Sequence, residues 1–362
     1  MDFKKELKTF FKGEVADDSA TLERYSKDAS LFQVKPRVVV FPKDAEDISS
    51  LASFVLKHPE EKLSLTCRSG GSDMSGGPLS ESIVIDMAGF NRIEEIGQDF
   101  AIAEPGVFYR DFEEETLKKN LLLPCFPASR ELCTLGGMVG NNSGGEKTLS
   151  FGKIEDYIEK LNVVLADGKE HEFKPLSMDE LKIKMSQSDF EGEVYRKTFQ
   201  LLEENYDVVK SAKPKVSKNS AGYYLWNVYD RERGTFDLTK LFVGSQGTLG
   251  IITKAKFKLI HPLPYSSMLV VFLKDETLLA EVTEAVMQEK PEAFELYDDH
   301  TIKLALRFFS DFLKILKGNI LSLAFRFLPE FFMFLRGGMP KLVLLAEFSG
   351  NTPQEVFEKA KK

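Results

Sequence analysis

The feature that most constrains the fold is a run of small residues at positions 67–78, which reads Cys-Arg-Ser-Gly-Gly-Ser-Asp-Met-Ser-Gly-Gly-Pro. It lies between Leu63–Cys67, which alternates like a strand, and Ile83–Ile85, which has the pattern of a short buried strand. Glycine permits positive φ and close backbone approach, so the N–H groups of such a loop can turn inward and hold an anion. A plain glycine-rich turn is the alternative, and this loop alone does not decide between the two.

Size, charge and cysteine content narrow the class of protein. The 362 residues are enough for two domains, and a net charge of −8 argues against sequence-independent binding of nucleic acid. The three cysteines show neither metal-ligand spacing nor a pairing pattern, which suits a reducing cytoplasm. The N-terminal residues lack the apolar core of a signal peptide, and no apolar stretch is long enough to span a membrane.

The residues around the first loop predict a parallel βαβ unit. Arg37–Phe41 is a β-branched run, and Asp44 can cap a following helix whose apolar face comprises Ile48, Leu51, Val55 and Leu56. Two strands joined by a helix normally lie parallel, so the loop leaves the carboxyl end of a strand, where α/β sheets usually bind ligands. Because a strand and not a helix follows Pro78, the loop is not the nicotinamide-dinucleotide fingerprint of a Rossmann fold.

Two further glycine clusters follow the first. Residues 134–145 read Thr-Leu-Gly-Gly-Met-Val-Gly-Asn-Asn-Ser-Gly-Gly, and residues 244–250 read Gly-Ser-Gln-Gly-Thr-Leu-Gly. A second backbone surface that lies against a large flat ligand explains so many small residues better than one turn does. Between the clusters we expect a β-hairpin at Asp167-Gly168. We also expect a helix near 108–119 whose acidic patch, Glu113 to Glu115, is a solvated face and not a metal site.

The last hundred residues predict the beginning of a second α+β domain. Two prolines, at 262 and 264, mark the boundary, and the pattern then predicts strands at 268–273 and 342–348 with a helix near 276–290. The stretch 304–335 is rich in Phe and Leu, and we interpret it as helical core or, alternatively, as a helix that docks on a membrane or a partner. The sequence stops inside a helical pattern, which suggests a truncated second domain.

Together the three clusters resemble the PCMH-type FAD-binding domain of the vanillyl-alcohol-oxidase-like flavoproteins. The motifs that carry the likeness are residues 68–76, Thr134–Gly137, Asn141–Gly144, Gly152 and residues 244–250. Within that family the chain is similar to the branch of D-lactate dehydrogenases, glycolate oxidase flavoprotein subunits and D-2-hydroxyglutarate dehydrogenases. The resemblance implies an α+β fold with three parts: a helical lead-in at 1–32, a two-subdomain PCMH-type FAD-binding domain at 33–262, and an incomplete ferredoxin-like α+β substrate cap at 263–362.

The resemblance also implies FAD as the cofactor and a role for each cluster. Backbone N–H groups of residues 69–73 would hold the pyrophosphate, and the second cluster would line the flavin and ribityl chain. Ile251 and Ile252, at the start of the strand that follows the third cluster, would contact the pyrimidine or adenine edge. Arg68 would assist the phosphates or be a salt-bridged structural arginine, and Asn141 and Asn142 would bind FAD or form a turn. The complete set implied to bind FAD is Arg68, Ser69, Gly70, Gly71, Ser72, Asp73, Ser75, Gly76, Pro127, Thr134, Gly136, Gly137, Gly140, Asn141, Asn142, Ser143, Gly144, Gly152, Gly247, Gly250, Ile251 and Ile252.

The chain departs from the family at three positions in or beside the glycine clusters. Ser72 stands where relatives with covalently bound flavin have histidine, and Cys133 lies near but not at the position of a second, cysteinyl link. We therefore expect non-covalent FAD, with Cys133 as a buried, inert thiol. Gln246 stands where this branch usually has glutamate, and we make no prediction of its effect on the flavin.

A larger departure concerns the catalytic residues. The resemblance implies a His-x-Gly-x-Gly-Asn-x-His stretch that binds a divalent metal and accepts the substrate hydroxyl proton. No such stretch is present among the four histidines, His58, His171, His261 and His300. We interpret the first three as surface residues, and we interpret the aspartates before His300 as helix caps. No catalytic base or metal ligand is therefore predicted, and a divalent metal is expected only if the missing cap segment exists.

Two functions of different classes remain. The first is FAD-dependent oxidation of a 2-hydroxy acid such as D-lactate, glycolate or D-2-hydroxyglutarate, with electrons passed to a quinone, cytochrome, flavoprotein or iron–sulfur protein. The second is an FAD-binding subunit or truncated remnant without turnover of its own. An NADPH-dependent reductase of the enolpyruvyl-sugar type is a third alternative that fits the loops less well. We expect a cytoplasmic protein that binds no nucleic acid, with peripheral contact at the inner face of the membrane as an alternative.

Overall fold

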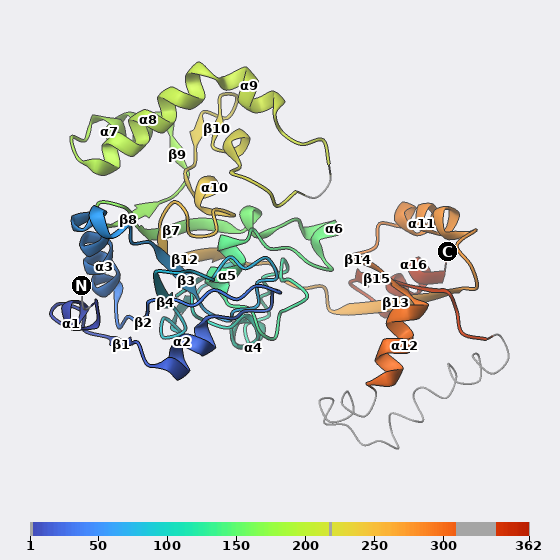
Figure 1. The fold of residues 1–362 in the computed structure, drawn as a ribbon. Coiled ribbons are helices and arrows are strands. Elements are labelled where there is room, and N and C mark those ends of the chain that lie inside the picture. Colours follow the sequence, from blue (N-terminus) through green and yellow to red (C-terminus); the bar gives the residue numbers. More distant parts are fainter. Residues whose placement is uncertain (1–2, 217–218, 309–337, 362) are drawn as a thin grey trace. The chain divides into compact units, whose positions relative to one another are not determined.

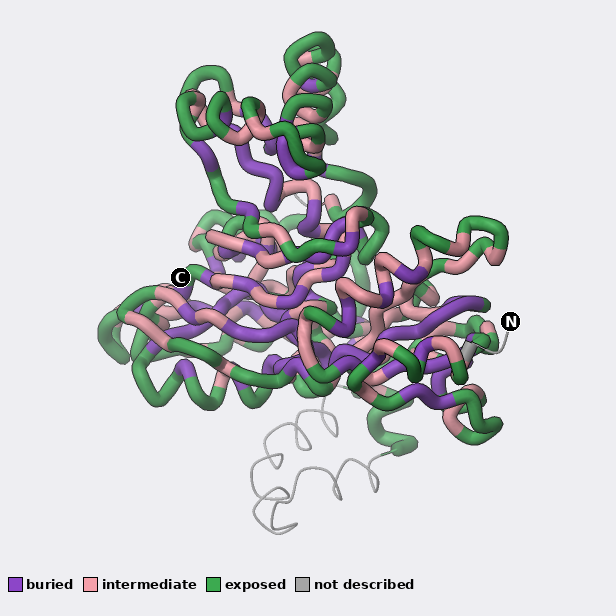
Figure 2. The backbone as a smooth tube through the Cα atoms, turned by 90° about the vertical axis from the view of Figure 1, so that its left-hand side faces the viewer, coloured by how far each residue is buried: buried purple, intermediate pink, exposed green. Residues whose placement is uncertain are grey.

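The computed structural model describes residues 3–216, 219–308 and 338–361 (Figure 1). The chain divides into two compact units. The first comprises Met1–Gly145 and Lys153–Pro262, and the second comprises Glu146–Gly152 and Leu263–Lys362. Both units combine helices with sheets, and Figure 2 marks the buried residues along the chain in purple. The predicted α+β fold class is therefore confirmed.

The first sheet carries the loop with the first glycine cluster. Its strand order is β1 (Glu14–Ala16), β2 (Val38–Phe41), β4 (Ile83–Asp86) and β3 (Leu65–Arg68). Strands β2, β4 and β3 are parallel, and β1 pairs antiparallel with β2 at the edge. The predicted βαβ unit is present, with β4 inserted between its two strands, so the loop after β3 does leave the carboxyl end of a parallel strand. The segment expected to be a helical lead-in also supplies β1.

Helix α3 (Ala45–Lys57) joins β2 to β3 and begins where the sequence predicts. The Asp44 side chain accepts a hydrogen bond from the backbone N–H of Asp47, 3.0 Å away, and so caps the first turn. Ile48 and Leu51 are buried as expected, but Leu56 is 62% exposed and Phe54 is buried instead. The prediction for Leu56 was wrong because position 54, three residues after Leu51, continues the apolar stripe and position 56 does not.

The second sheet of this unit is antiparallel throughout. It runs in the order β5 (Ile93–Ile96), β6 (Phe100–Ala103), β12 (Ile251–Lys258), β7 (Ile158–Val164) and β8 (Glu170–Phe173). Strands β7 and β8 form the hairpin predicted at Asp167-Gly168, where Gly168 has a φ of 72°. Alternate residues of β12 are buried, which confirms the alternating strand expected after the third glycine cluster.

Several elements between the hairpin and the third glycine cluster were not predicted. They are α7 (Met178–Ser186), α8 (Phe190–Glu204), α9 (Tyr206–Ser211) and a small sheet of β9 (Leu176–Ser177), β11 (Thr235–Phe236) and β10 (Tyr229–Asp230). Shorter pieces of this unit are α1 (Phe3–Leu7), α2 (Ser19–Tyr25), α4 (Tyr109–Leu117), α5 (Leu135–Gly140), α10 (Thr239–Phe242) and the 3-10 turns η1 (Pro59–Glu61), η2 (Ile154–Asp156) and η3 (Leu225–Asn227).

The second unit is built on an antiparallel sheet in the order β13 (Tyr265–Leu273), β15 (Leu342–Gly350) and β14 (Ala293–Asp298). Apolar residues of α11 (Leu279–Gln288) and α16 (Pro353–Lys361) pack on the sheet. Helices α12 (Asp299–Arg307) and α6 (Thr148–Phe151) also belong to this unit. The strands and helix predicted here are present, β14 was missed, and most of the Phe-rich stretch 304–335 lies outside the described residues. Among the described helices, none is long and apolar enough to cross a membrane.

Candidate functional site

A cavity of about 200 Å³ lies in the first unit where the three glycine clusters meet. The loop after β3 forms one part of its wall, the segment 127–143 with helix α5 forms a second, and the loop before β12 forms a third. Most residues implied to bind a cofactor line it, namely Arg68, Ser69, Gly70, Gly71, Ser72, Asp73, Pro127, Thr134, Gly136, Gly137, Gly140, Asn141, Ser143, Gly247, Gly250 and Ile252.

Six residues from the same set do not line the cavity: Ser75, Gly76, Asn142, Gly144, Gly152 and Ile251. Each of three has another structural setting. Asn142 is fully buried and accepts a hydrogen bond from the backbone N–H of Glu155 at 3.2 Å. Ile251 is part of the apolar core of the first sheet. Gly152, with a φ of 70°, ends α6 in the second unit.

Other cavity residues were not included in the prediction. They are Cys67, Gly77, Pro78, Met87, Pro105, Ser129, Cys133, Met138 and Gln246. Several of them are neighbours of predicted residues in the sequence, and local continuity could have found them. Met87, which follows β4, and Pro105, which follows β6, carry no local signal. They reach the cavity because β4 and β6 end beside it.

The loop after β3 offers backbone donors to the cavity. Within the described part of the chain, the N–H groups of residues 70–73 meet no hydrogen-bond acceptor. Gly71 has a φ of 62°, a conformation that favours glycine. The Asp73 carboxylate accepts hydrogen bonds from the N–H groups of Ser75 (2.7 Å) and Gly77 (3.1 Å), which holds the far end of the loop. Consecutive unpartnered N–H groups in such a loop suit an anion.

Arg68 adds a cation to these donors. Its guanidinium donates to the backbone carbonyl of Tyr25 at 3.3 Å and lies 5.1 Å from the centre of the Tyr25 ring. Within the described residues, no carboxylate lies within ion-pair distance of it. Burial lowers the pKa of Arg68, but an arginine side chain stays charged at neutral pH. The ion pair that a purely structural arginine would form is therefore not seen, and several N–H donors remain for a ligand.

The glycines of the cavity fall into two groups. A Cβ at Gly70 would overlap the carbonyl oxygen of Leu132, and a Cβ at Gly136 would lie 2.5 Å from Pro105, so protein packing demands glycine at both. A Cβ at Gly137 would approach nothing closer than 3.5 Å, and one at Gly140 nothing closer than 3.9 Å. Both residues are helical, and alanine would stabilise the helix. The space beside them is therefore a cradle that a Cβ would fill and that a flat ligand fits.

The third glycine cluster is joined to the second by backbone hydrogen bonds. The N–H of Gly244 donates to Val139 and the N–H of Gln246 donates to Gly140, each at 2.9 Å. Gly244 and Gly247 have φ values of 80° and 78°. These bonds place Gln246 beside the last turn of α5, where both line the cavity.

The two cavity cysteines are protonated thiols at neutral pH. Burial raises the pKa of Cys133 to about 11 and that of Cys67 to about 12. The thiolate is the nucleophilic form of cysteine, so neither side chain is activated for covalent chemistry.

The histidines do not line the cavity, and one of them lies in an unexpected place. The side chain of His171 is only 10% exposed, and its Nε2 lies 3.0 Å from the Asp167 carboxylate. Glu191, in the first turn of α8, approaches its other ring nitrogen at 4.0 Å. The prediction that His171 is a surface residue was therefore wrong, because α8 supplies a long-range neighbour that the sequence does not show.

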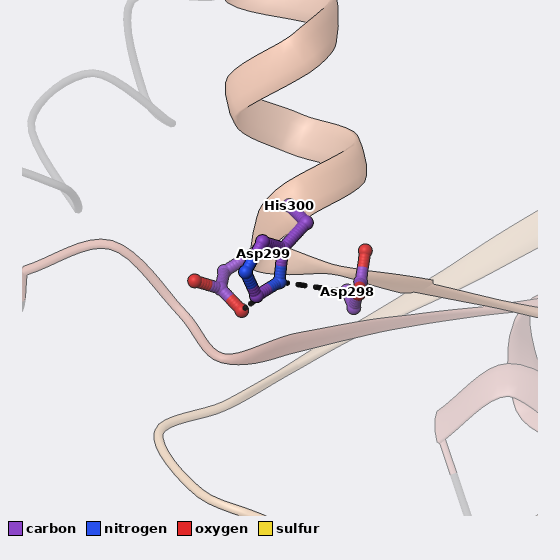
Figure 3. Close-up of side chains that lie close together, drawn as sticks. All are labelled: Asp298, Asp299 and His300. Atoms are coloured by element: carbon purple, nitrogen blue, oxygen red, sulfur yellow. Dashed lines mark ion pairs between the residues drawn. The ribbon is translucent and has the colours of Figure 1, made fainter.

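Figure 3 shows Asp298, Asp299 and His300, whose ligand atoms lie close together at the start of α12. Asp298 accepts a hydrogen bond from the N–H of Thr301 at 2.8 Å, as the predicted helix cap does. Asp299 pairs with Lys303 and Lys341, and these hydrogen bonds hold its pKa far below the usual range. His300 is 76% exposed, 3.5 Å from Asp298 and 3.4 Å from Asp299. Capping and lysine pairing account for both carboxylates.

The acidic patch on α4 is not uniform. Glu114 and Glu115 are solvated and pair with Lys118. Glu113 has a side chain only 13% exposed and pairs with Arg130. The prediction of a solvated face was wrong for Glu113, because the segment after Phe126 folds back over the first turns of the helix.

The comparisons with known proteins identify the domain. Residues 36–174 match the family model of an FAD binding domain. The chain is 27% identical over 301 residues to a D-2-hydroxyglutarate dehydrogenase of Pseudomonas putida, covering 82% of this chain and 30% of the relative. It is 28% identical over 293 residues to glycolate oxidase subunit GlcD of Bacillus subtilis, covering 79% and 51%. It is 26% identical over 271 residues to a D-lactate dehydrogenase of Archaeoglobus fulgidus, covering 74% and 48%.

The chain thus spans between 30% and 51% of the length of these relatives. Among solved structures, an alkyldihydroxyacetonephosphate synthase superposes with a TM-score of 0.69 at 18% identity, covering 99% of this chain and 59% of that one. This likeness shows a shared fold. The glycine clusters, the family match over residues 36–174 and the shared fold therefore agree on an FAD-binding domain of the PCMH type in this chain.

Proposed function

We propose that the chain binds FAD non-covalently in the cavity of its first unit and belongs to a flavoprotein that oxidises a 2-hydroxy acid. The observation that carries the proposal is the pairing of two features in one cavity. One is an anion site made of unpartnered N–H groups and Arg68, and the other is the cradle at Gly137 and Gly140. The relatives named above share oxidation of a 2-hydroxy acid, which supports the substrate class.

Different residues of the cavity would hold different parts of the cofactor. The N–H groups of residues 70–73 and the Arg68 guanidinium would neutralise the pyrophosphate. Gly137 and Gly140 would allow the flat part of the cofactor to approach the backbone of α5. The chemistry that FAD supplies when bound is acceptance of a hydride from the hydroxyl-bearing carbon of the substrate.

The attachment of FAD would be non-covalent. Ser72 offers a hydroxyl where a covalent link would need an imidazole, and burial keeps the Cys133 thiol protonated. Acid precipitation of the yellow protein tests this: all flavin is expected in the supernatant. Flavin that stays with the precipitated polypeptide would contradict non-covalent binding.

A second candidate is an FAD-binding subunit without turnover of its own. The ionisable side chains of the cavity wall are Cys67, Arg68, Asp73 and Cys133. Burial works to raise the pKa of Asp73, but hydrogen bonds from Gly77 and Ser75 outweigh it and lower the pKa, which makes this carboxylate a poor proton acceptor. The wall as described thus favours binding over acid–base catalysis.

We further propose the domain limits 33–262 for FAD binding and 263–362 for a substrate cap, preceded by a lead-in at 1–32. The acceptor of electrons would be a quinone, a cytochrome, a flavoprotein or an iron–sulfur protein. The protein would act in the cytoplasm or at the inner face of the membrane.

An anaerobic visible spectrum of the purified chain separates the two candidates. Bleaching of the flavin by D-lactate, glycolate or D-2-hydroxyglutarate is the result expected for a dehydrogenase. Bleaching by dithionite and by none of the acids would support the binding subunit. Reduction by NADPH would favour the reductase alternative. A colourless protein that takes up no FAD would contradict both candidates.

A further inference from the structure

The partly buried ion pair between α4 and the loop that follows Phe126 has no role in the function proposed so far. The Arg130 guanidinium pairs with the Glu113 carboxylate and lies 4.6 Å from the centre of the Phe126 ring. The hydroxyl of Tyr109, on the same face of α4, is 3.3 Å from Glu113. The side chains of Glu113 and Arg130 are 13% and 37% exposed, so solvent screens this pair less than it screens the pairs of Lys118.

The loop held by this pair forms one wall of the cavity. Residues 127–133 contain no helix or strand and contribute Pro127, Ser129 and Cys133 to the lining. The N–H groups of Leu132 and Cys133 donate to the carbonyl of Ser129 within the loop, and contacts with α4 tie the loop to the rest of the unit. Arg110 donates to the carbonyl of Glu131, and the N–H of Tyr109 donates to the carbonyl of Cys133 at 3.0 Å. All of these contacts come from the first two turns of α4.

The same loop supports the glycine loop that carries the anion site. Gly70 lies against the carbonyl oxygen of Leu132 so closely that a Cβ would not fit. The Thr134 hydroxyl donates to the Ser69 hydroxyl at 2.7 Å. A displacement of residues 127–133 would therefore move both the wall and the N–H groups of residues 70–73.

We infer that the Glu113–Arg130 pair is a positioning pair for the cofactor site: it sets the place of the 127–133 loop and thereby the affinity for FAD. The inference rests on the proposed binding of FAD in this cavity. Neither side chain lines the cavity, so the pair acts through the loop and not by contact with the cofactor.

The consecutive glutamates of α4 offer a matched set of variants. Glu113→Gln keeps the shape of the side chain and removes the charge that Arg130 needs, whereas Glu114→Gln and Glu115→Gln make the same chemical change on the solvated face. The dissociation constant of FAD is measured by flavin fluorescence at 10 °C on the apo form of the full chain. We expect Glu113→Gln to raise it at least tenfold and the two control variants to change it less than twofold.

A double-mutant cycle with Arg130→Gln tests whether the two residues act as one unit. The double variant is expected to bind FAD no more weakly than the weaker single variant. A dissociation constant for Glu113→Gln within twofold of that for Glu114→Gln would overturn the inference, whatever its effect on melting temperature. The inference would also be overturned if the fold-change in the dissociation constant of the double variant equalled the product of the two single fold-changes.

Three outcomes are kept apart by controls. A wild-type chain that binds no FAD contradicts the proposed function itself, before any variant is compared. A purely structural pair would lower the melting temperature of the apo form and leave the dissociation constant at 10 °C unchanged, which contradicts the positioning role. If Glu113→Gln does not fold, Arg130→Gln takes its place, since it removes the other charge of the pair; FAD affinity within twofold of that of Glu114→Gln would then contradict the inference.

Discussion

At the scale of single residues, adjacent glycines of α5 are glycine for different reasons. Gly136 is packed against Pro105, so the fold itself forbids a side chain there. Gly137 has room for a Cβ within the protein, and a helix with alanine at this position would be more stable. Glycine at 137 therefore carries a stability cost that the protein's own packing does not explain, and the FAD proposed for the cavity would explain it.

This difference gives a paired prediction. Gly137→Ala is expected to keep or raise apo stability, by up to about 1 kcal/mol, while FAD binding is lost. Gly136→Ala is expected to lower apo stability by about 1–3 kcal/mol through overpacking. Urea unfolding of the apo forms and titration with FAD measure the two quantities. Normal FAD affinity of Gly137→Ala would show that the cradle holds no ligand.

Asp73 is the residue through which pH should act on the first glycine loop. Its folded pKa is lower than in an unfolded chain, so its stabilisation is complete above the unfolded value of about 3.9. The stabilisation is lost as the pH falls through the folded pKa. We therefore expect Asp73→Asn to melt at a lower temperature than wild type at pH 6, with the gap closing towards pH 3. A gap that is constant over this range would contradict an ionised Asp73 as the loop's anchor.

At the scale of elements, α6 shows how a short segment is held by a distant sheet. Residues 146–152 are separated in sequence from the rest of the second unit by all of residues 153–262. The Lys147 ammonium pairs with Glu292 and, at 3.5 Å, with Glu347, and all three side chains are less than one-fifth exposed. The Ser150 hydroxyl donates to the carbonyl of Pro291 at 3.1 Å. One cation therefore serves two largely buried carboxylates.

Because this cluster has one cation and two carboxylates, substitutions of its residues should differ in their effect on stability. Lys147→Gln leaves two carboxylates without a cation and should destabilise the second unit by roughly 3 kcal/mol, whereas Glu347→Gln leaves a one-to-one pair and should cost about 1 kcal/mol or less. Lys359→Gln, in an ion pair with Glu355 whose two side chains are each more than one-third exposed, is the control and should cost at most about 1 kcal/mol. Urea unfolding with amide hydrogen exchange in β15 reports the result. Equal losses for the Lys147 and Glu347 variants would contradict the account.

The pH dependence of this cluster follows from Lys147. Burial opposes the charge, but hydrogen bonding to Glu292 outweighs it and raises the pKa of Lys147. A raised lysine pKa gives stabilisation that is complete below the unfolded value of about 10.4 and is lost only as the pH rises through the folded value. The difference between wild type and Lys147→Gln should therefore stay constant from pH 6 to pH 9. A difference that falls within this range would contradict the raised pKa.

At the scale of the whole molecule, the chain crosses between its two units at 145/146, 152/153 and 262/263. The described residues that line the cavity with the three glycine clusters belong to the first unit. A ligand in that cavity should therefore stabilise the first unit directly and the second only as far as the two unfold together.

Calorimetry with and without FAD tests this division. At a free FAD concentration 100 times the dissociation constant, linkage predicts about 2.7 kcal/mol of stabilisation of the first unit. For a unit of this size, that amounts to a rise in melting temperature of roughly 5–10 °C. Amide exchange in β13 and β15 should slow far less than exchange in β2 and β4. Equal slowing in both sets would place the ligand elsewhere or show a single cooperative unit.

Sequence patterns predicted those parts of the fold that depend on neighbours along the chain. Asp44 caps α3, the Asp167-Gly168 hairpin forms, and β12 alternates, because each depends on residues a few positions apart. The helices α7 and α8 and strand β14 were missed, although Ser177 with Glu180 forms a capping box that the sequence contains. Leu56 was wrongly predicted to lie on the buried face of α3, and it is exposed.

What the sequence determined by itself was the presence of three glycine-rich clusters and, through their resemblance, the class of cofactor. Those properties reside in local backbone freedom, which glycine confers wherever the chain goes next. Only the tertiary structure decided that Glu113 pairs with Arg130, that His171 lies beside Glu191, and that Met87 and Pro105 reach the cavity. It also separated Gly136, where packing excludes a side chain, from Gly137, where the protein leaves room for a Cβ. The reason is that burial and partnership depend on contacts between residues far apart in the sequence, and a local pattern carries no record of them.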